Sequence, residues 1–260
     1  MTILGTVQAC WRYPVKSMQG RRVDALDLTA SGIAGDRVWG VIDTTTGHLL
    51  SAKRASRLLE ATGEDDRIVL PDGTEVAADD PAVHEVLSTW LERPVRLAHV
   101  DPEVALSYEM TFDPPNDDAE QFEIPAPPGT FLDLAALHAV TTATLAGCAA
   151  ARGDLDWDVR RFRPNVVLDV DGPVFVEQDW VGRTVRLGDA AVDVAMPTVR
   201  CAMPLRAQPP TDEAPALPRQ PGIFSALTEL NTVSPNHLGI YATCATPGTI
   251  RVGDPVELVD

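Results

Sequence analysis

The sequence predicts an α+β fold that is mainly β, built from two β-rich domains with a few accessory helices. Short runs of β-branched and apolar residues recur along the chain and are broken by Gly, Asp and Pro. Strands and helices do not alternate regularly, which argues against a doubly wound parallel sheet. A stretch rich in Pro and acidic residues, 111–130, indicates a linker or surface loop. We therefore expect an N-terminal β-barrel-like domain over 1–110 and a second β-barrel domain over 131–260.

The N-terminal region contains strands, one hairpin and one helix. Residues 2–10, 23–29 and 38–43 have the composition of short strands. Residues 67–76, "RIVLPDGTEV", predict a hairpin, because two apolar runs flank a Pro-Asp-Gly turn. Residues 79–94 predict a helix, since an Asp cap and a proline open it, apolar residues follow at helical spacing, and a second proline ends it.

The C-terminal region is expected to consist mostly of strands and turns. Residues 136–154 predict a short strand that runs into a helix capped by Thr141 or Thr142. A second Pro-rich stretch, 208–222, predicts a long mobile loop. Asp-Gly, Gly-Asp and Pro-Gly pairs punctuate the remaining strand segments, which are 165–172, 183–196, 238–248 and 249–259.

The net charge of the chain argues against two classes of partner, nucleic acids and anionic membranes. The chain has 21 basic and 38 acidic side chains, a net charge of −17. Such acidity opposes binding to nucleic acid and to anionic membranes, both of which need Lys and Arg. The N-terminus has no basic region followed by an apolar run, and no window reaches the roughly 18 apolar residues of a membrane span. We therefore expect a cytoplasmic protein with reduced cysteines.

Several common catalytic motifs are missing from the sequence. It has no GxGxxG, no P-loop, no GxSxG and no complete HExxH. The five histidines have no metal-ligand spacing, and the four cysteines form no CxxC pair. These patterns argue against dinucleotide-binding, serine-hydrolase and zinc-hydrolase functions.

Cys201 is the cysteine with the surroundings of a functional thiol. It lies in "PTVRCAMPL", directly after Arg200, and a neighbouring cation favours the thiolate that binds soft metals or attacks electrophiles. The flanking prolines are typical of a loop rather than of a core. The other three cysteines, Cys10, Cys148 and Cys244, are expected to be inert core residues.

Basic and hydroxyl residues elsewhere are candidates for binding an oxyanion. "RRFRPN" (160–165) places three arginines in six residues, although they could instead pair with Asp154, Asp156 and Asp158 on the surface. Lys16 and Ser17 of "YPVKS" could both donate to a phosphate or oxo group, although an exposed turn lysine is also common.

Two further candidates have equally simple alternatives. Arg37 of "GDRVW" begins a strand, where exposed arginines are common. Thr141, Thr142 and Thr144 lie at a helix start that favours an anion, but capping alone would explain one of these hydroxyls.

Taken in order, these segments resemble a known family. "YPVKS", "GDRVW", "FRPNVV", the "RC" pair and the terminal "PGTIRVGDPVEL" resemble MOSC-domain proteins with an N-terminal MOSC β-barrel domain. The chain is similar to the mitochondrial amidoxime-reducing component and its bacterial relatives. The resemblance implies that the two expected domains are a MOSC N-terminal β-barrel domain and a MOSC domain.

The resemblance also implies a cofactor and the residues that bind it. Members of this family bind molybdenum through a cysteine sulfur, and their cofactor is a Mo-molybdopterin whose phosphate is held by basic and hydroxyl groups. Cys201 would then be the metal ligand and, with Arg200, a catalytic residue, since Arg200 would stabilise developing negative charge. The implied cofactor-binding residues are Lys16, Ser17, Arg37, Thr141, Thr142, Arg163, Asn165, Val199, Arg200 and Tyr241.

The sequence departs from the family pattern in three places. Met18 follows "YPVKS" where relatives often have a cysteine, and "LDLAALHAVTT" replaces the usual acidic-Ser-Pro opening before the first MOSC helix. No cysteine cluster is present for the iron–sulfur domain of some bacterial relatives. Electrons would therefore come from a separate protein of the ferredoxin or flavoprotein type.

The implied function is a molybdenum-dependent reductase of N-hydroxylated compounds, such as amidoximes, hydroxamic acids and N-hydroxy bases. The alternative is a molybdenum-cofactor binding or carrier protein, or a sulfur carrier that uses a persulfide on Cys201.

Overall fold

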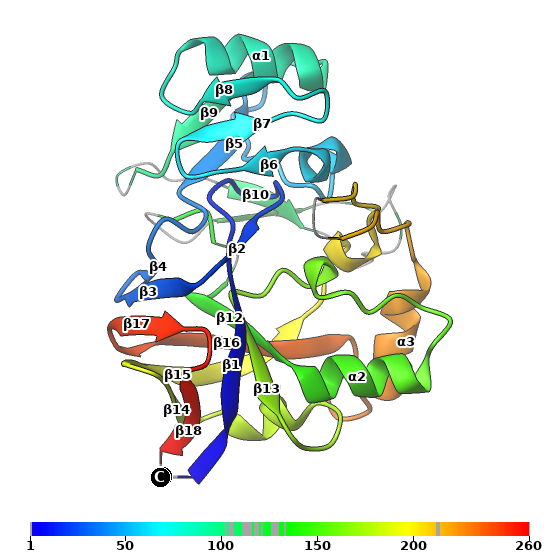
Figure 1. Cartoon of the computed structure of the whole chain (residues 1–260). Helices are drawn as coiled ribbons and strands as arrows, with labels where there is room; N and C mark the ends of the chain where they lie inside the picture. Colours follow the sequence, from blue (N-terminus) through cyan, green and yellow to red (C-terminus); the bar gives the residue numbers. More distant parts are fainter. Residues whose placement is uncertain are drawn as a thin grey trace.

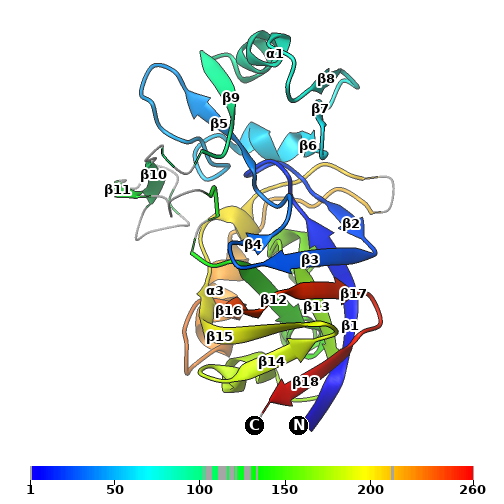
Figure 2. The same cartoon turned by 90° about the vertical axis from the view of Figure 1, so that its left-hand side faces the viewer.

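The protein consists of a closed β-barrel and a smaller β-rich part that lies against one end of it (Figures 1 and 2). The computed structural model describes residues 2–101, 103, 107–110, 116, 120, 122–125, 130–132, 134–211 and 214–259. Strands dominate and helices are few, so the predicted mainly-β class is confirmed. Among the described residues, no helix is both long enough and apolar enough to cross a membrane.

Seven strands close the barrel in the order β13–β12–β16–β15–β14–β18–β1, and β1 completes the ring by pairing with β13. Neighbouring strands are antiparallel except for the parallel pair β12–β13. Because β1 pairs with β13 and β18, the first strand belongs to this barrel although it precedes the whole smaller part. The strands span Thr2–Arg12 (β1), Leu137–Thr141 (β12), Val166–Val170 (β13), Thr184–Leu187 (β14), Ala190–Val199 (β15), His237–Thr246 (β16) and Pro255–Val259 (β18).

The smaller part contains the predicted hairpin and helix. β7 (Arg67–Val69) and β8 (Glu75–Ala77) pair across the Pro-Asp-Gly turn, as expected. Helix α1 (Ala82–Leu91) begins just after Pro81, and the Asp80 side chain accepts a hydrogen bond from the Ala82 amide at 2.9 Å. The remaining strands of the N-terminal region are β2 (Arg21–Val23), β3 (Ala25–Thr29), β4 (Gly32–Ile33), β5 (Trp39–Asp43), β6 (Thr62–Gly63) and β9 (Val95–His99).

Some elements differ from the expectations. Helix α2 (Thr142–Ala151) follows β12 and is capped by Thr141, as predicted, whereas helix α3 (Gly222–Leu230) was not foreseen. Within the expected linker, β11 (Phe122–Pro125) pairs with β10 (Ser107–Met110), and most of the other residues of 111–130 lie outside the described residues. Four short 3₁₀ helices and one more strand complete the fold: η1 (Ser56–Glu60), η2 (Val159–Arg161), η3 (Val176–Trp180), η4 (Met203–Leu205) and β17 (Gly248–Arg251).

Two buried arginines hold the chain that follows Cys201. Arg161 has no exposed surface and donates to the carbonyl oxygens of Pro204, Arg206 and Pro218 at 3.2, 3.3 and 3.0 Å. Arg160 donates to the Pro215 carbonyl at 2.9 Å. The carboxylates that pair with these two arginines are Asp156 and Asp158, as the surface-pairing alternative proposed, but both arginines are buried rather than solvated.

The two parts of the molecule have separate hydrophobic cores, and η4 contributes a residue to the core of the smaller part. The barrel interior is filled by side chains from its own strands and from β3 and β17. The smaller part has a core of its own, and Met203 of η4 packs into it together with the half-buried Cys201. The segment around Cys201 therefore joins the barrel to the smaller part.

The close approach of β1 to β13 gives a test of the barrel. A Cβ at Gly5 would overlap the carbonyl oxygen of Asp169, so Gly5→Ala should push the two strands apart. We expect it to lower the free energy of unfolding by about 1–3 kcal/mol. Thr6→Ala, an exposed position on the same strand, should change it by no more than about 0.5 kcal/mol. Equal chemical denaturation curves for the two variants would contradict the barrel closure described above.

Candidate functional site

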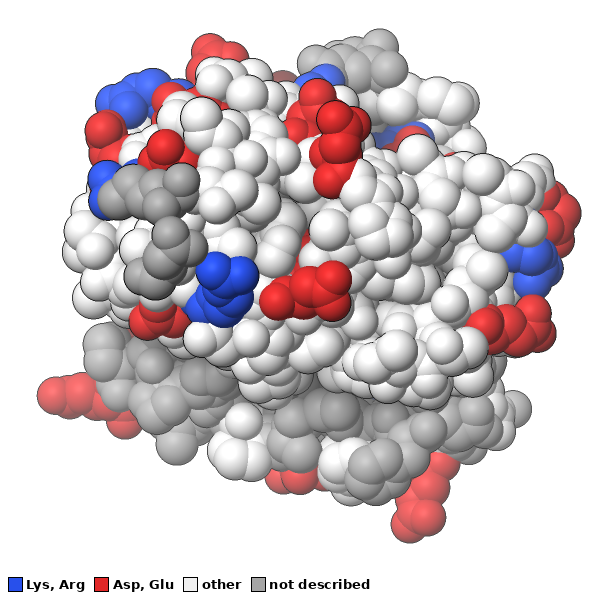
Figure 3. Space-filling model, turned by 90° about the horizontal axis from the view of Figure 1, so that it is seen from below, with Lys and Arg blue, Asp and Glu red and all other residues white. Residues whose placement is uncertain are grey.

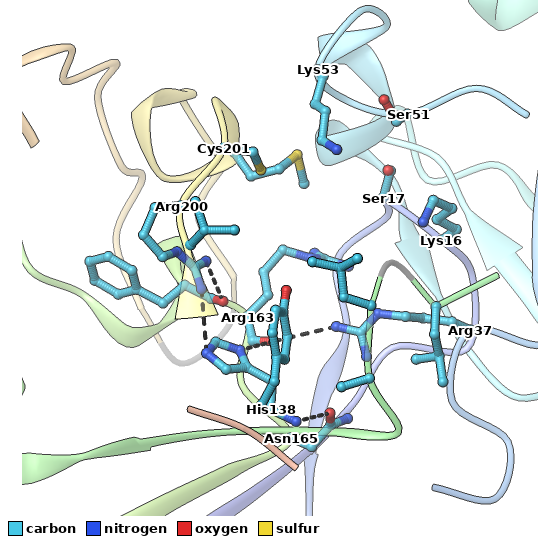
Figure 4. Close-up of a pocket in the computed structure, with 17 residues that line it drawn as sticks. Lys16, Ser17, Arg37, Ser51, Lys53, His138, Arg163, Asn165, Arg200 and Cys201 are labelled. Carbon is cyan, nitrogen blue, oxygen red and sulfur yellow. Dashed lines mark hydrogen bonds between the residues drawn. The ribbon is translucent and has the colours of Figure 1, made fainter. Parts of the chain in front are cut away.

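A pocket at the junction of the two parts brings the predicted site residues together (Figure 4). Every predicted site residue except Thr141 and Thr142 lines it. We call it the cysteine pocket. Its described lining residues are Lys16, Ser17, Arg37, Ser51, Lys53, Leu132, Leu134, Ala135, His138, Phe162, Arg163, Asn165, Val199, Arg200, Cys201, Met203 and Tyr241.

The pocket is assembled from segments far apart in the sequence. Lys16 and Ser17 lie in the loop after β1, and Arg37 in the turn before β5. Arg163 lies three residues before the strand β13, and Cys201 follows β15. Each motif thus presents its side chains just beyond a strand end, where the backbone is free to turn.

Three of these loops place a non-glycine residue in the left-handed region of the backbone. Ser17, Arg37 and Arg163 have φ values of 67°, 52° and 55°. A fourth, Asn236 with φ 61°, holds the Arg200 backbone, because its side chain donates to the Arg200 carbonyl at 2.7 Å. Such conformations cost of order 1–3 kcal/mol each and concentrate at functional sites. Four of the six described non-glycine residues with a positive φ therefore line the pocket or support it, and the other two, Glu92 and Phe175, do not line it.

The lining is strongly basic although the protein is acidic. None of the lining residues that the structure describes is acidic. Five of them are cationic: Lys16, Arg37, Lys53, Arg163 and Arg200. By contrast, on the face seen in Figure 3 the basic side chains are dispersed and interspersed with acidic ones. A concentration of positive charge in a chain of net charge −17 indicates a site for an anion.

Tyr13 and Asp36 hold two of these cations in place. The guanidinium groups of Arg163 and Arg37 lie over the Tyr13 ring, 4.3 and 4.8 Å from its centre. Asp36 forms an ion pair with Arg37 and accepts a hydrogen bond from the Tyr13 amide at 2.7 Å. Burial raises the pKa of Tyr13, so its hydroxyl stays neutral and donates to the Pro164 carbonyl at 3.2 Å. The electron-rich ring thereby offsets the repulsion between the two arginines.

Arg200 is oriented by a buried histidine. His138 Nδ1 lies 3.4 Å from the Arg163 carbonyl oxygen, which can only accept, so Nδ1 carries the proton. Nε2 is then free to accept from Arg200 Nη1 at 3.3 Å. Arg200 Nη2 donates to the Phe162 carbonyl at 2.9 Å. A Cβ at Gly239 would lie 2.7 Å from His138 Nε2, so glycine is required there for this arrangement.

Cys201 differs from the two fully buried cysteines. Burial raises the pKa of Cys10 to about 11 and that of Cys148 to about 12, in agreement with inert core thiols. Cys201 is half-buried and lines the pocket. Cys244 is also half-buried, but it packs against the barrel core rather than in the pocket.

Thr141 and Thr142 lie outside the pocket lining, and their hydroxyls have other partners. Thr141 is fully buried, caps α2 and donates to the Glu177 carboxylate at 2.7 Å. Thr142 donates to Asp169 at 2.9 Å. From the unusual "LDLAALHAVTT" segment, Leu134 and Ala135 line the pocket instead.

Sequence reasoning missed Ser51, Lys53 and His138, which also line the pocket. Ser51 and Lys53 belong to no recognisable motif and reach the pocket only through the fold of the smaller part. His138 lies in β12. In the sequence, only its position three residues before the predicted helix cap Thr141 suggested that it could lie near the site. Among the described residues, no group of three His, Cys, Asp or Glu side chains could hold a metal ion.

Comparisons with known proteins cover both parts of the chain. A family model described as "MOSC domain" matches residues 128–257, and one described as "MOSC N-terminal beta barrel domain" matches residues 4–86. Mitochondrial amidoxime-reducing component 1 of Homo sapiens is 26% identical over 304 residues, covering 98% of this chain and 83% of the relative. The Mus musculus protein of the same name is 26% identical over 300 residues, with the same coverage. The crystal structure of the YUAD protein from Bacillus subtilis aligns with a TM-score of 0.46 and 12% identity, covering 98% of this chain and 96% of that one.

The strained conformation of Ser17 gives the first prediction for the site. Ser17→Gly and Ser17→Ala both remove the hydroxyl, but only glycine relieves the positive φ. We expect the glycine variant to be more stable than the alanine variant by about 1 kcal/mol. Both variants should bind an anionic ligand more weakly than the original protein. Thermal unfolding measures the difference in stability between the two variants. Equal stability would contradict the strained backbone at Ser17.

The buried His138 gives the second prediction for the site. Burial, and then the positive charge of Arg200, hold the pKa of His138 well below its ordinary value of 6.5. As the pH falls below that value, the unfolded histidine binds a proton and the folded one does not, so stability decreases. The slope approaches about 1.4 kcal/mol per pH unit.

His138→Gln should therefore show a flatter dependence of the free energy of unfolding on pH between about 6.5 and 5. Denaturant titrations across this range provide the measurement. Parallel curves for the variant and the original protein would show that His138 is not buried in its neutral form.

Proposed function

Because the chain belongs to the MOSC family, with a MOSC N-terminal β-barrel domain before its MOSC domain, we propose that the cysteine pocket binds a molybdenum cofactor. The protein then acts as a molybdenum-dependent reductase of N-hydroxylated compounds. The observation that carries this proposal is the meeting of one accessible thiol, Cys201, with five cationic side chains in a single pocket.

The residues present fit the chemistry of a molybdopterin. A thiolate is a soft ligand that suits molybdenum already carrying sulfur ligands. The cations and the Ser17 hydroxyl suit a phosphate and the oxygens of a pterin. The enclosed volume of the pocket is about 70 Å³, so a molecule of cofactor size would extend beyond it or displace lining side chains. The half-exposed Lys53 is one side chain that could move.

Each residue has a defined part in this proposal. Cys201 would bind the metal through its sulfur, and Lys16, Ser17, Arg37, Arg163 and Asn165 would hold the anionic part of the cofactor. When bound, the cofactor supplies two-electron chemistry at the end of the pocket that carries Cys201. Arg200, fixed by His138 and the Phe162 carbonyl, would stabilise negative charge that develops on the substrate.

The overall reaction needs an external source of electrons. An N-hydroxylated compound takes up two electrons and two protons and releases the parent amine or amidine and water. The name of the human and mouse relatives, amidoxime-reducing component, supports this substrate class. We propose that a separate ferredoxin- or flavoprotein-type partner supplies the electrons.

A metal analysis with a matched control tests the proposal. The protein is produced in a host that makes molybdenum cofactor, alongside Cys201→Ala and Cys244→Ala, which remove half-buried thiols inside and outside the pocket. We expect about one molybdenum per chain and turnover of benzamidoxime with an artificial electron donor for the original protein and for Cys244→Ala. Cys201→Ala should lose turnover by at least about 100-fold, because losing a metal ligand should cost more than the roughly 10–100-fold lost when a residue that only orients a ligand is removed.

Three outcomes would contradict the proposal. No molybdenum in the original protein would exclude the cofactor. Equal turnover by Cys201→Ala would exclude the thiol as a metal ligand. A cyanide-releasable sulfur on Cys201 without any turnover would favour the carrier function instead.

A further inference from the structure

A second cavity, separate from the cysteine pocket, lies behind Arg163 and Tyr13. Both residues line this cavity, and Arg163 lines the cysteine pocket as well. The cavity has a volume of about 630 Å³, which is within the range of small-molecule sites. We propose that it binds a small aromatic molecule that carries an oxyanion.

Three parts of the chain enclose this space, which we call the arginine cavity. Trp11 comes from the end of β1, Leu70 and Pro71 from the turn of the β7–β8 hairpin, and Pro209 and Pro210 from the Pro-rich segment. The Pro-rich segment is held in place by Arg160 and Arg161 through backbone carbonyls. Ligand sites occur preferentially at such junctions between parts of a fold.

Two buried donors in the lining lack a partner. Arg160 is 7% exposed, and its Nε and Nη2 atoms bind the two oxygens of Asp158, each at 2.9 Å. Its Nη1 atom is buried and has no hydrogen-bond partner within the described part of the chain. The same holds for Trp11 Nε1. Buried donors left unpaired cost about 1–3 kcal/mol each. Both atoms are shielded from water, so a ligand that displaces the side chains covering them would gain these hydrogen bonds.

The charge of the lining indicates that the acceptor is an anion. Arg21, Arg22, Arg160 and Arg163 line the cavity against two acidic residues, Glu60 and Glu64. Three of these residues have ion-pair partners outside the lining: Glu64 pairs with Arg67 at 2.8 Å, Arg160 with Asp158 at 2.9 Å, and Arg21 with Asp65. With these partners included, cations still outnumber acidic groups around the cavity. A phosphate or carboxylate would bind Arg160 with a charge-assisted hydrogen bond.

The rest of the lining suits a flat apolar group. Val69, Leu70 and three prolines contribute apolar surface, with Trp11 close by. The Arg22 guanidinium lies 6.0 Å from the centre of the Trp11 ring, so a cation and an aromatic face are available side by side. An aromatic body against the prolines, with its oxyanion toward Arg160, would use both halves of the cavity.

Calorimetric titration with 1-naphthyl phosphate tests the proposal on the full chain loaded with cofactor. 1-Naphthol lacks the oxyanion and inorganic phosphate lacks the aromatic body, so each should bind at least about tenfold more weakly. Trp11→Phe keeps an aromatic ring and removes only the N–H donor, and Arg160→Lys keeps the charge and removes Nη1. Each variant should weaken 1-naphthyl phosphate about tenfold, the loss expected for one hydrogen bond to a charged group.

Arg186→Met is the control, because Arg186 is an exposed cation of β14 that lines neither the cysteine pocket nor the arginine cavity. It should leave binding of the probe unchanged. Circular dichroism verifies that each variant is folded, and Trp11→Phe decides the question if Arg160→Lys unfolds.

Four results would overturn the proposal. These are no binding of the probe, equal affinity for inorganic phosphate, unchanged affinity in Trp11→Phe, or an equal loss of affinity in Arg186→Met. The last result would show that the probe binds through the overall charge of the protein and not in the arginine cavity.

Discussion

The stacking of Arg37 and Arg163 on the buried ring of Tyr13 is the interaction on which the candidate site depends. Like charges repel, and burial weakens the screening by water that would normally offset this repulsion. The aromatic ring and the carboxylate of Asp36 provide the compensation. These contacts also join the loop after β1, the turn before β5 and the segment before β13. The same interaction therefore concentrates positive charge and fixes the barrel against the smaller part.

The site is maintained at a cost in stability. Ser17, Arg37 and Arg163 all have left-handed backbone conformations that most residues avoid. His138 is buried in its neutral form in order to accept a hydrogen bond from Arg200. Proteins retain such unfavourable features mainly where they are needed for function. Their concentration around Cys201 supports a binding site whose arginines are positioned before a ligand arrives, because the compensating contacts come from the protein itself.

The sequence predicted the local motifs better than the contacts between distant segments. "YPVKS", "GDRVW" and "FRPN" could be recognised because each places its functional side chains within a few residues of a strand end. The sequence could not show that Thr141 and Thr142 lie outside the pocket lining, because a hydroxyl at a helix start can cap the helix, bind a carboxylate or bind a ligand. The burial of Arg160 and Arg161 depends on carbonyl groups 43 to 57 residues away. The closure of the barrel by β1 depends on pairing with even more distant strands. Neither the burial of these arginines nor the closure of the barrel can be predicted from residues that are close together in the sequence.

The most direct test is the sulfur coordination of molybdenum, because the account depends on Cys201 as the residue that joins the protein to its cofactor. X-ray absorption at the molybdenum edge would compare the cofactor-loaded protein with Cys201→Ser. We predict that the variant retains molybdenum through the cationic residues but loses one sulfur from the metal's coordination sphere. An unchanged number of sulfur ligands would contradict the account, because the metal would then be bound without the thiol at the centre of the pocket.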